Sequence, residues 1–276
     1  MNGIACRFLL QSIFQMASFL AIASPIVAQE PDLSGLANGL AERIGRSKVK
    51  SVVVTDFLTP LGTESSTGKY LAGKLAESWA QHDQKFKVVE RERLGAALDQ
   101  QKKNAKDLAD PKTLKDLGKL LNAEAVVVGT VEVLEDRLTL YISTLEVANG
   151  KLLTSAEETF PRNGMLETLS QATPQLSLDA LPRAGVNGAR PPLCIFCPQP
   201  EFPKEARVAK IPQALVLLDI VVTPQGTPAG IKILKDPGYG FTEKAIKAVR
   251  GWRFRPVVDK DKSPIAARVQ IEITFR

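Results

Sequence analysis

The spacing of apolar residues changes several times along the chain, and each change predicts a structural element. In the first half, valine-rich runs alternate with stretches in which leucine or alanine recurs every three or four positions. The runs predict buried strands, and the wider spacing predicts helices with one apolar face. The strands are expected at 49–57, 86–90, 125–134, 138–142 and 152–160. The helices are expected at 31–47, 71–79, 94–98, 111–121 and from residue 165 onward.

Two local signals support this order of elements. Asp110 before Pro111 is typical of a helix N-cap followed by proline at the first helical position. Asn149 and Gly150 predict a tight hairpin, because both residues tolerate a positive φ. Residues 29–178 are therefore expected to form a mixed α/β domain that ends in antiparallel strands.

The pattern restarts after a segment that is rich in proline and glycine. This segment, 179–197, is expected to be a linker that carries a Cys-x-x-Cys pair. Beyond it, the expected elements are a helix at 203–210, strands at 214–222 and 231–234, a helix at 241–252 and a strand at 265–275. This αββαβ order predicts a small α+β domain over residues 198–276, with helices packed on one sheet.

The first 28 residues are typical of a segment that directs export. Arg7 precedes an apolar stretch, Pro25 interrupts it, and Ala28 stands before a plausible cleavage point at Gln29. A retained membrane anchor is the alternative, because 8–28 is about as long as a bilayer-spanning helix needs to be. A cleaved signal peptide is favoured over an inner-membrane anchor. In either case we expect the rest of this two-domain chain to be exported.

Charge and composition narrow the classes of function. The chain of 276 residues has a net charge of +6, but residues 190–276 hold 15 Lys+Arg against 8 Asp+Glu, a net of +7. Residues 29–189 hold 20 against 22, a net of −2, and Arg7 supplies the remaining charge. Export argues against nucleic acid as a partner. His82 is the single histidine and there are three cysteines, so we expect no catalytic residue, no metal and no cofactor, and a protein that is not an enzyme.

Cys194 and Cys197 remain as a pair once the leader, which contains Cys6, is removed. In an oxidising compartment this pair is expected to close a small disulfide loop. A redox-active pair is one alternative, but such motifs lie at a helix N-terminus after a strand, whereas this pair lies among several prolines. Unpaired or metal-linked thiols are a further alternative.

The second domain resembles the TonB C-terminal domain family. The resemblance covers about 198–276 and rests on the motifs at 200–207, 216–222, 245–256 and 269–275. The helix that leads into Trp252-Arg-Phe254-Arg-Pro256 is the most recognisable of them. One departure is Ala214, where the family usually has a glycine shortly before the first strand.

This resemblance implies binding by strand addition, in which an extended segment of an outer-membrane transporter or other envelope protein pairs with an exposed sheet edge. The implied edge is the last strand. Its candidate partner-binding residues are Ile265, Arg268, Val269, Gln270, Ile271 and Glu272. The alternative is that this strand is already covered or is paired in a homodimer.

The first domain resembles, less specifically, the CsgG/FlgO-like and TolB N-terminal-like envelope domains. The similar segments are 52–57, 86–94 and 117–131. This resemblance implies an α/β fold of the kind found in secretion assemblies and outer-membrane accessory proteins. Only the fold is carried over to this chain.

We therefore expect a periplasmic TonB-family protein that binds an envelope partner and transmits energy or a signal for transmembrane transport. Inner-membrane motor proteins are further partners if the N-terminus is retained. However, transducers of this family have a retained membrane helix with a polar or histidine residue, followed by a long proline-rich spacer. This chain has no histidine before His82, and it has a globular domain in place of the spacer. The alternatives are a structural adaptor of an envelope assembly, acting through the CsgG/FlgO-like domain, and a thiol-disulfide enzyme.

Overall fold

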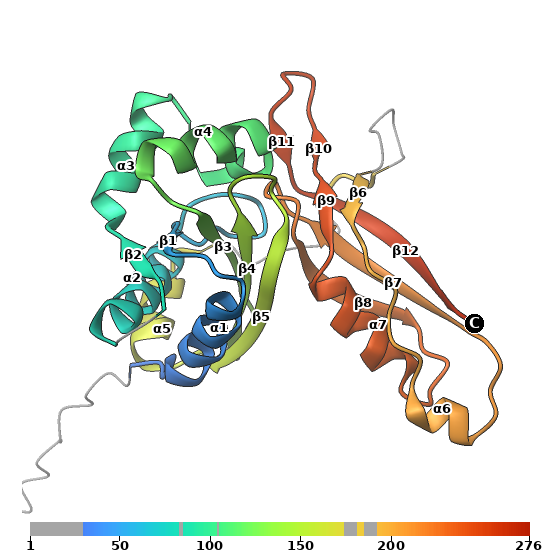
Figure 1. Ribbon diagram of the computed structural model, residues 1–276. Helices are drawn as coiled ribbons and strands as arrows, with labels where there is room; N and C mark the ends of the chain where they lie inside the picture. Colours follow the sequence, from blue (N-terminus) through green and yellow to red (C-terminus); the bar gives the residue numbers. More distant parts are fainter. Residues whose placement is uncertain (1–29, 83–84, 104, 174–180, 185–191) are drawn as a thin grey trace, which may run out of the picture.

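The computed structural model describes residues 30–82, 85–103, 105–173, 181–184 and 192–276 (Figure 1). Among these residues, no helix combines the length and apolar character required to cross a membrane. The predicted leader at 1–28 lies outside the described residues.

The first domain is built on a five-stranded sheet with the order β2-β1-β3-β4-β5. Strand β1 pairs in parallel with β2 and β3, whereas β3, β4 and β5 follow one another as antiparallel neighbours. The strands are β1 (Ser51–Val54), β2 (Lys87–Val89), β3 (Ala125–Val133), β4 (Arg137–Glu146) and β5 (Leu152–Pro161). The described chain thus forms the mixed α/β domain that the sequence predicts.

Helices cover both faces of this sheet, as the strand pattern requires. The helices are α1 (Ser34–Arg46), α2 (Ser66–Gln81), α3 (Arg91–Gln100), α4 (Pro111–Leu121) and α5 (Gly164–Ser170), with a short 3₁₀ turn η1 (Ala105–Ala109). Helices α1, α2 and α5 share one apolar core with Val52 and Val54, whereas α3 and α4 share another with Val53. This division follows from the alternation of side chains along a strand.

The N-termini of two helices are fixed by side-chain caps. Asp110 accepts a hydrogen bond from the backbone N–H of Thr113 at 2.9 Å, so the predicted cap of α4 is confirmed. Ser65 accepts from the N–H of Gly68 at 3.1 Å and thereby starts α2. A Cβ on Gly68 would lie 1.8 Å from the carbonyl oxygen of Phe57, so glycine at this position allows the helix to approach the segment after β1 closely.

The second domain has a three-stranded antiparallel sheet with the order β12-β7-β8. Its main elements are α6 (Lys204–Val208), β7 (Ala214–Val222), β8 (Pro228–Lys235), α7 (Phe241–Arg250) and β12 (Ala267–Phe275). One face of the sheet packs against α7, and Phe241 and Phe275 meet edge-to-face in that core at a centroid distance of 4.9 Å. The predicted αββαβ domain is confirmed.

Two small ribbons depart from the sequence prediction. The segment 179–197, expected to be a linker, contains β6 (Leu193–Phe196), which pairs with β9 (Arg253–Arg255). The last predicted strand, 265–275, is interrupted at Ala266. Its first residue lies in β11 (Pro264–Ile265), which forms a hairpin with β10 (Val257–Val258).

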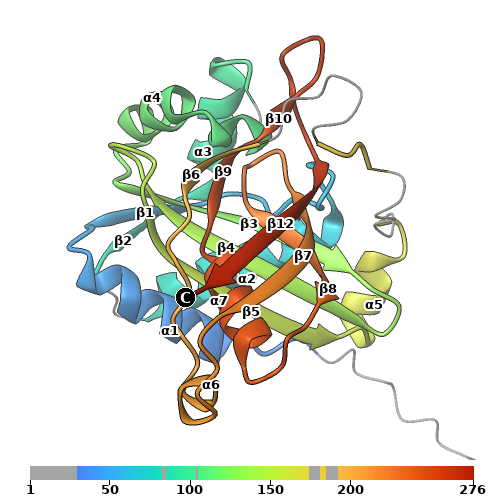
Figure 2. The same cartoon turned by 90° about the vertical axis from the view of Figure 1, so that its right-hand side faces the viewer.

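The two domains are in contact, and their sheets lie one in front of the other in Figure 2. Two turns with the same pattern, Thr-Pro-x-Gly-Thr, meet between them, one at 59–63 and the other at 223–227. In each turn the two threonine hydroxyl oxygens are hydrogen-bonded, at 2.6 Å and 2.7 Å. A Cβ on Gly62 would lie 2.5 Å from Cγ of Pro224, so the turns pack directly against each other. We call this pair of turns the clasp.

Polar side chains form a second contact between the domains. Glu132 on β3 accepts a hydrogen bond from the Tyr141 hydroxyl at 3.1 Å, and the backbone N–H of Gly230 in β8 acts to lower the pKa of the Glu132 carboxyl group. Glu157 on β5 forms an ion pair with Arg250 of α7. Burial raises the pKa of both carboxyl groups above the ordinary range, although these partners oppose the shift.

The raised pKa of Glu132 predicts a pH-dependent cost to stability. A carboxyl group whose pKa is higher in the folded state stabilises the fold when it is protonated, and this contribution is lost as pH rises through the folded pKa. We therefore expect the free energy of unfolding of Glu132→Gln, relative to that of the wild type, to be higher at pH 7 than at pH 4. Urea unfolding at both values measures this difference. Glu135→Gln, at an exposed position nearby, is the control and should show a much smaller change.

Candidate partner-binding edge

Strand β12 lies at the end of its sheet, so one of its sides faces away from β7. The inner side is paired along the whole strand, from Ala267 opposite Val222 to Phe275 opposite Ala214. Backbone groups in an antiparallel pair point alternately toward and away from the partner strand. The outer side of β12 therefore presents the N–H and C=O groups of every second residue.

Residues 182–184 identify which backbone groups point outward. The N–H of Arg268 donates to the carbonyl oxygen of Pro182, and the N–H of Ala184 donates to the carbonyl oxygen of Arg268, both at 2.9 Å. This contact is a short parallel bridge, which we call the strap. Because the backbone N–H and C=O of Arg268 point outward, those of Gln270, Glu272 and Thr274 must point outward as well.

The outward-facing backbone of Gln270, Glu272 and Thr274 forms what we call the open edge. Within the described part of the chain, no residue pairs with it. The side chains of these three residues are exposed, on the sheet face opposite α7. The alternate side chains, including Val269 and Ile271, pack into the core of the domain.

The structure separates the six predicted partner-binding residues into three groups. Val269, Gln270, Ile271 and Glu272 lie on β12 beyond the strap. Ile265 is in β11, paired with Val257, and so is not part of this edge. Arg268 is on β12, but its outward backbone is already occupied by the strap. The alternative that the strand is covered thus applies to its first residues.

The side chain of Arg268 is engaged inside the chain as well. Its guanidinium forms a buried ion pair with Asp219 of β7, whose side chain is 1% exposed. The sequence pattern marks both residues only as polar positions within strands. Because they come from different strands, their pairing depends on the register between β7 and β12, which periodicity alone does not determine.

The predicted cysteine pair lies beside this domain's core. The structure joins Cys194 and Cys197 by a disulfide within and just after β6. Leu193, Ile195 and Phe196 on the same strand are exposed by 59%, 52% and 40%. The pair lies in a strand and directly after it and not at a helix N-terminus, which differs from the setting expected of a redox motif.

Comparisons with known families place both domains. Residues 198–276 match the family model "Gram-negative bacterial TonB protein C-terminal", and residues 34–165 match the model "FlgO protein". The resemblances to the TonB C-terminal family and to the FlgO family that the sequence indicated are confirmed. No curated protein matches this chain.

Solved structures with similar folds are distant. The C-terminal domain of LpoB from Escherichia coli is 16% identical with a TM-score of 0.38, covering 47% of this chain and 98% of that one. Lipoprotein GNA1162 from Neisseria meningitidis is 16% identical with a TM-score of 0.34, covering 40% and 79%. The TonB C-terminal domain of Pseudomonas aeruginosa is 23% identical with a TM-score of 0.26, covering 31% and 85%.

The fold and the family matches together define a class of protein. It is an envelope-associated protein with a FlgO-like α/β domain and a C-terminal domain of the TonB type.

Proposed function

We propose that this protein is a periplasmic binding protein without catalytic activity, which captures an extended segment of an envelope partner on the open edge. The observation that carries the proposal is that the backbone N–H and C=O groups of Gln270, Glu272 and Thr274 point outward from a strand at the edge of its sheet, in a domain of the TonB type. An added strand receives main-chain hydrogen bonds from such an edge and requires little side-chain specificity. The partner class is an outer-membrane transporter or another envelope protein with an extended segment.

The strap limits the length of the segment that can add. Positions 270–274 span five residues, or about 17 Å of extended chain at roughly 3.4 Å per residue. A longer segment must displace residues 182–184 from Arg268. We therefore propose that the partner segment that is captured, and through which energy is transmitted, is short.

The test uses Glu272→Pro, because the N–H of Glu272 points outward. Proline at an edge position removes that donor without breaking the pairing with β7. The full-length protein carries a photoreactive residue in place of Thr274, and crosslinking is carried out in cells. We expect Glu272→Pro to lower the yield of the crosslinked envelope partner at least tenfold. Glu272→Ala, which keeps the N–H, is the matched control and should retain the yield.

Two outcomes would contradict the proposal. If Glu272→Pro remains folded, as judged by thermal unfolding, and still crosslinks with the wild-type yield, capture occurs elsewhere. If the crosslinked product is a dimer of this chain, the edge serves a homodimer.

The clasp favours a second function, that of a structural adaptor in an envelope assembly. The TonB-type domain packs on the FlgO-like domain through the two turns and the Arg250–Glu157 ion pair. Two domains joined by such contacts suit an adaptor in which the FlgO-like domain makes the main contacts. An adaptor should keep its activity in cells when Glu272→Pro abolishes capture, so the same variant separates the two functions.

A further inference from the structure

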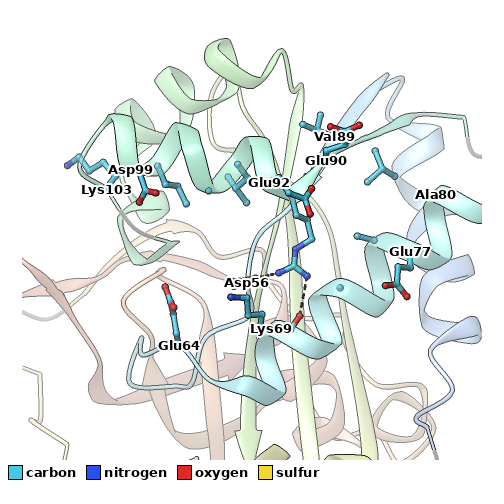
Figure 3. Close-up of a pocket in the computed structure, with 17 residues that line it drawn as sticks. Asp56, Glu64, Lys69, Glu77, Ala80, Val89, Glu90, Glu92, Asp99 and Lys103 are labelled. Carbon is cyan, nitrogen blue, oxygen red and sulfur yellow. Dashed lines mark hydrogen bonds and ion pairs between the residues drawn. The ribbon is translucent and has the colours of Figure 1, made fainter.

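A groove runs between α2 and α3 of the FlgO-like domain, with a volume of about 810 Å³ (Figure 3). Glu77 lies at one end, and Asp99 and Lys103 lie at the other. The wall includes apolar side chains from both helices, among them Ala76 and Leu98. The groove is on a different domain from the open edge.

The charges around the groove are unbalanced. Arg91 is held inside it by an ion pair with Asp56, and it also donates to the carbonyl oxygen of Lys69 at 3.1 Å. Apart from this pair, five carboxylates and two ammonium groups line the groove. The carboxylates are Glu64, Glu77, Glu90, Glu92 and Asp99. The lining therefore carries a net charge of −3 around a partly apolar surface.

Two glycines within the helices keep the groove wide. A Cβ on Gly95 of α3 would meet no atom within 4 Å, and a Cβ on Gly73 of α2 would meet the Arg91 guanidinium at 3.1 Å. Glycine inside a helix costs about 1 kcal/mol relative to alanine. At Gly95 no neighbouring atom requires the absence of a side chain. A larger residue there would only narrow the groove.

We propose that this groove binds a basic, amphipathic polypeptide segment of a partner protein. Lysine or arginine side chains would meet the carboxylate rim, and apolar side chains would contact the wall between the helices. A segment is favoured over a compact ligand because the acidic side chains are spread from Glu77 to Asp99 along the groove. The proposal is independent of strand addition at the open edge.

The test measures binding of two fluorescent peptides to the full-length protein by anisotropy. One is a 12-residue peptide of lysine and leucine at helical spacing, and the other has glutamate in place of each lysine. We expect the lysine peptide to bind and the glutamate peptide not to bind. Raising the salt concentration should weaken the binding, because added ions screen the rim.

Two pairs of variants locate the binding. Gly95→Trp places a large side chain in the groove, whereas Gly35→Trp places one on α1, where a Cβ also meets no atom within 4 Å. Glu92→Lys with Asp99→Lys reverses two rim charges, and Glu135→Lys with Glu167→Lys reverses two exposed charges elsewhere. We expect each groove variant to weaken binding at least tenfold and each control to stay within twofold of wild type.

Equal binding by Gly95→Trp and Gly35→Trp would overturn the proposal, as would equal binding of the two peptides. Loss of binding in Glu272→Pro but not in Gly95→Trp would place the lysine peptide on the open edge instead. Circular dichroism of each variant establishes that it is folded, so a loss of binding is attributed to the groove.

Discussion

Asp219→Ala is expected to lower the free energy of unfolding by about 3–5 kcal/mol, because it removes a buried carboxylate that is ion-paired with the guanidinium of Arg268. Asp219 is 1% exposed at its side chain and Arg268 is 10% exposed, so water replaces little of the lost interaction. Arg268 also anchors the strap through its backbone. We therefore expect the strap to loosen, with faster hydrogen exchange at the Ala184 amide.

The measurement is urea unfolding of the full-length protein, monitored by tryptophan fluorescence, to which Trp252 of the affected domain and Trp79 of the other domain both contribute. The matched control is the double variant Asp219→Leu with Arg268→Met, which removes both charges and keeps most of the volume. Replacing a whole buried pair is often neutral or stabilising. If the single and double variants lose the same stability, the ion pair is not what the single variant disrupts.

Gly226→Ala is expected to destabilise the protein by about 3 kcal/mol or more, through two separate effects. Gly226 has a φ of +74°, where a non-glycine residue costs about 1–2 kcal/mol. In addition, its Cβ would lie 2.0 Å from the carbonyl oxygen of Phe254, so the backbone must shift. This shift would also disturb the hydrogen bond from the Phe254 N–H to the Gly226 carbonyl oxygen, at 2.9 Å.

Gly238→Ala separates the two effects. Gly238 has nearly the same φ, +76°, but a Cβ there would meet no atom within 4 Å. It should therefore lose only the cost of the backbone conformation, about 1–2 kcal/mol. The comparison is made by urea unfolding at one pH. Equal losses in the two variants would show that the contact with Phe254 is not strained by a methyl group.

Periodicity was sufficient to predict most of the elements. The strand expected at 214–222 coincides with β7, and that expected at 125–134 with β3 to within one residue, because both have long apolar runs. The strand expected at 231–234 is longer in the structure, since Pro228 and Gly230 conceal the start of β8. The surrounding prolines likewise conceal β6, although Leu-Cys-Ile-Phe favours extended structure.

The open edge could be predicted only in part. The resemblance to the TonB family indicated the correct strand, and Gln270 and Glu272 lie on its outer side. The strap was not predictable, because residues 182–184 carry no strand pattern and pair through backbone atoms alone. The clasp could have been found as a repeated five-residue pattern, but the contact between its turns depends on how the domains pack.

The clasp also has a consequence for recognising related chains. Two short copies of Thr-Pro-x-Gly-Thr, one in each domain, are visible in a sequence without any structure. Chains that combine these two domain types and keep both copies are expected to hold them in this orientation. Those that lack either copy should allow the domains to reorient, which small-angle scattering would detect as a broader distribution of interdomain distances.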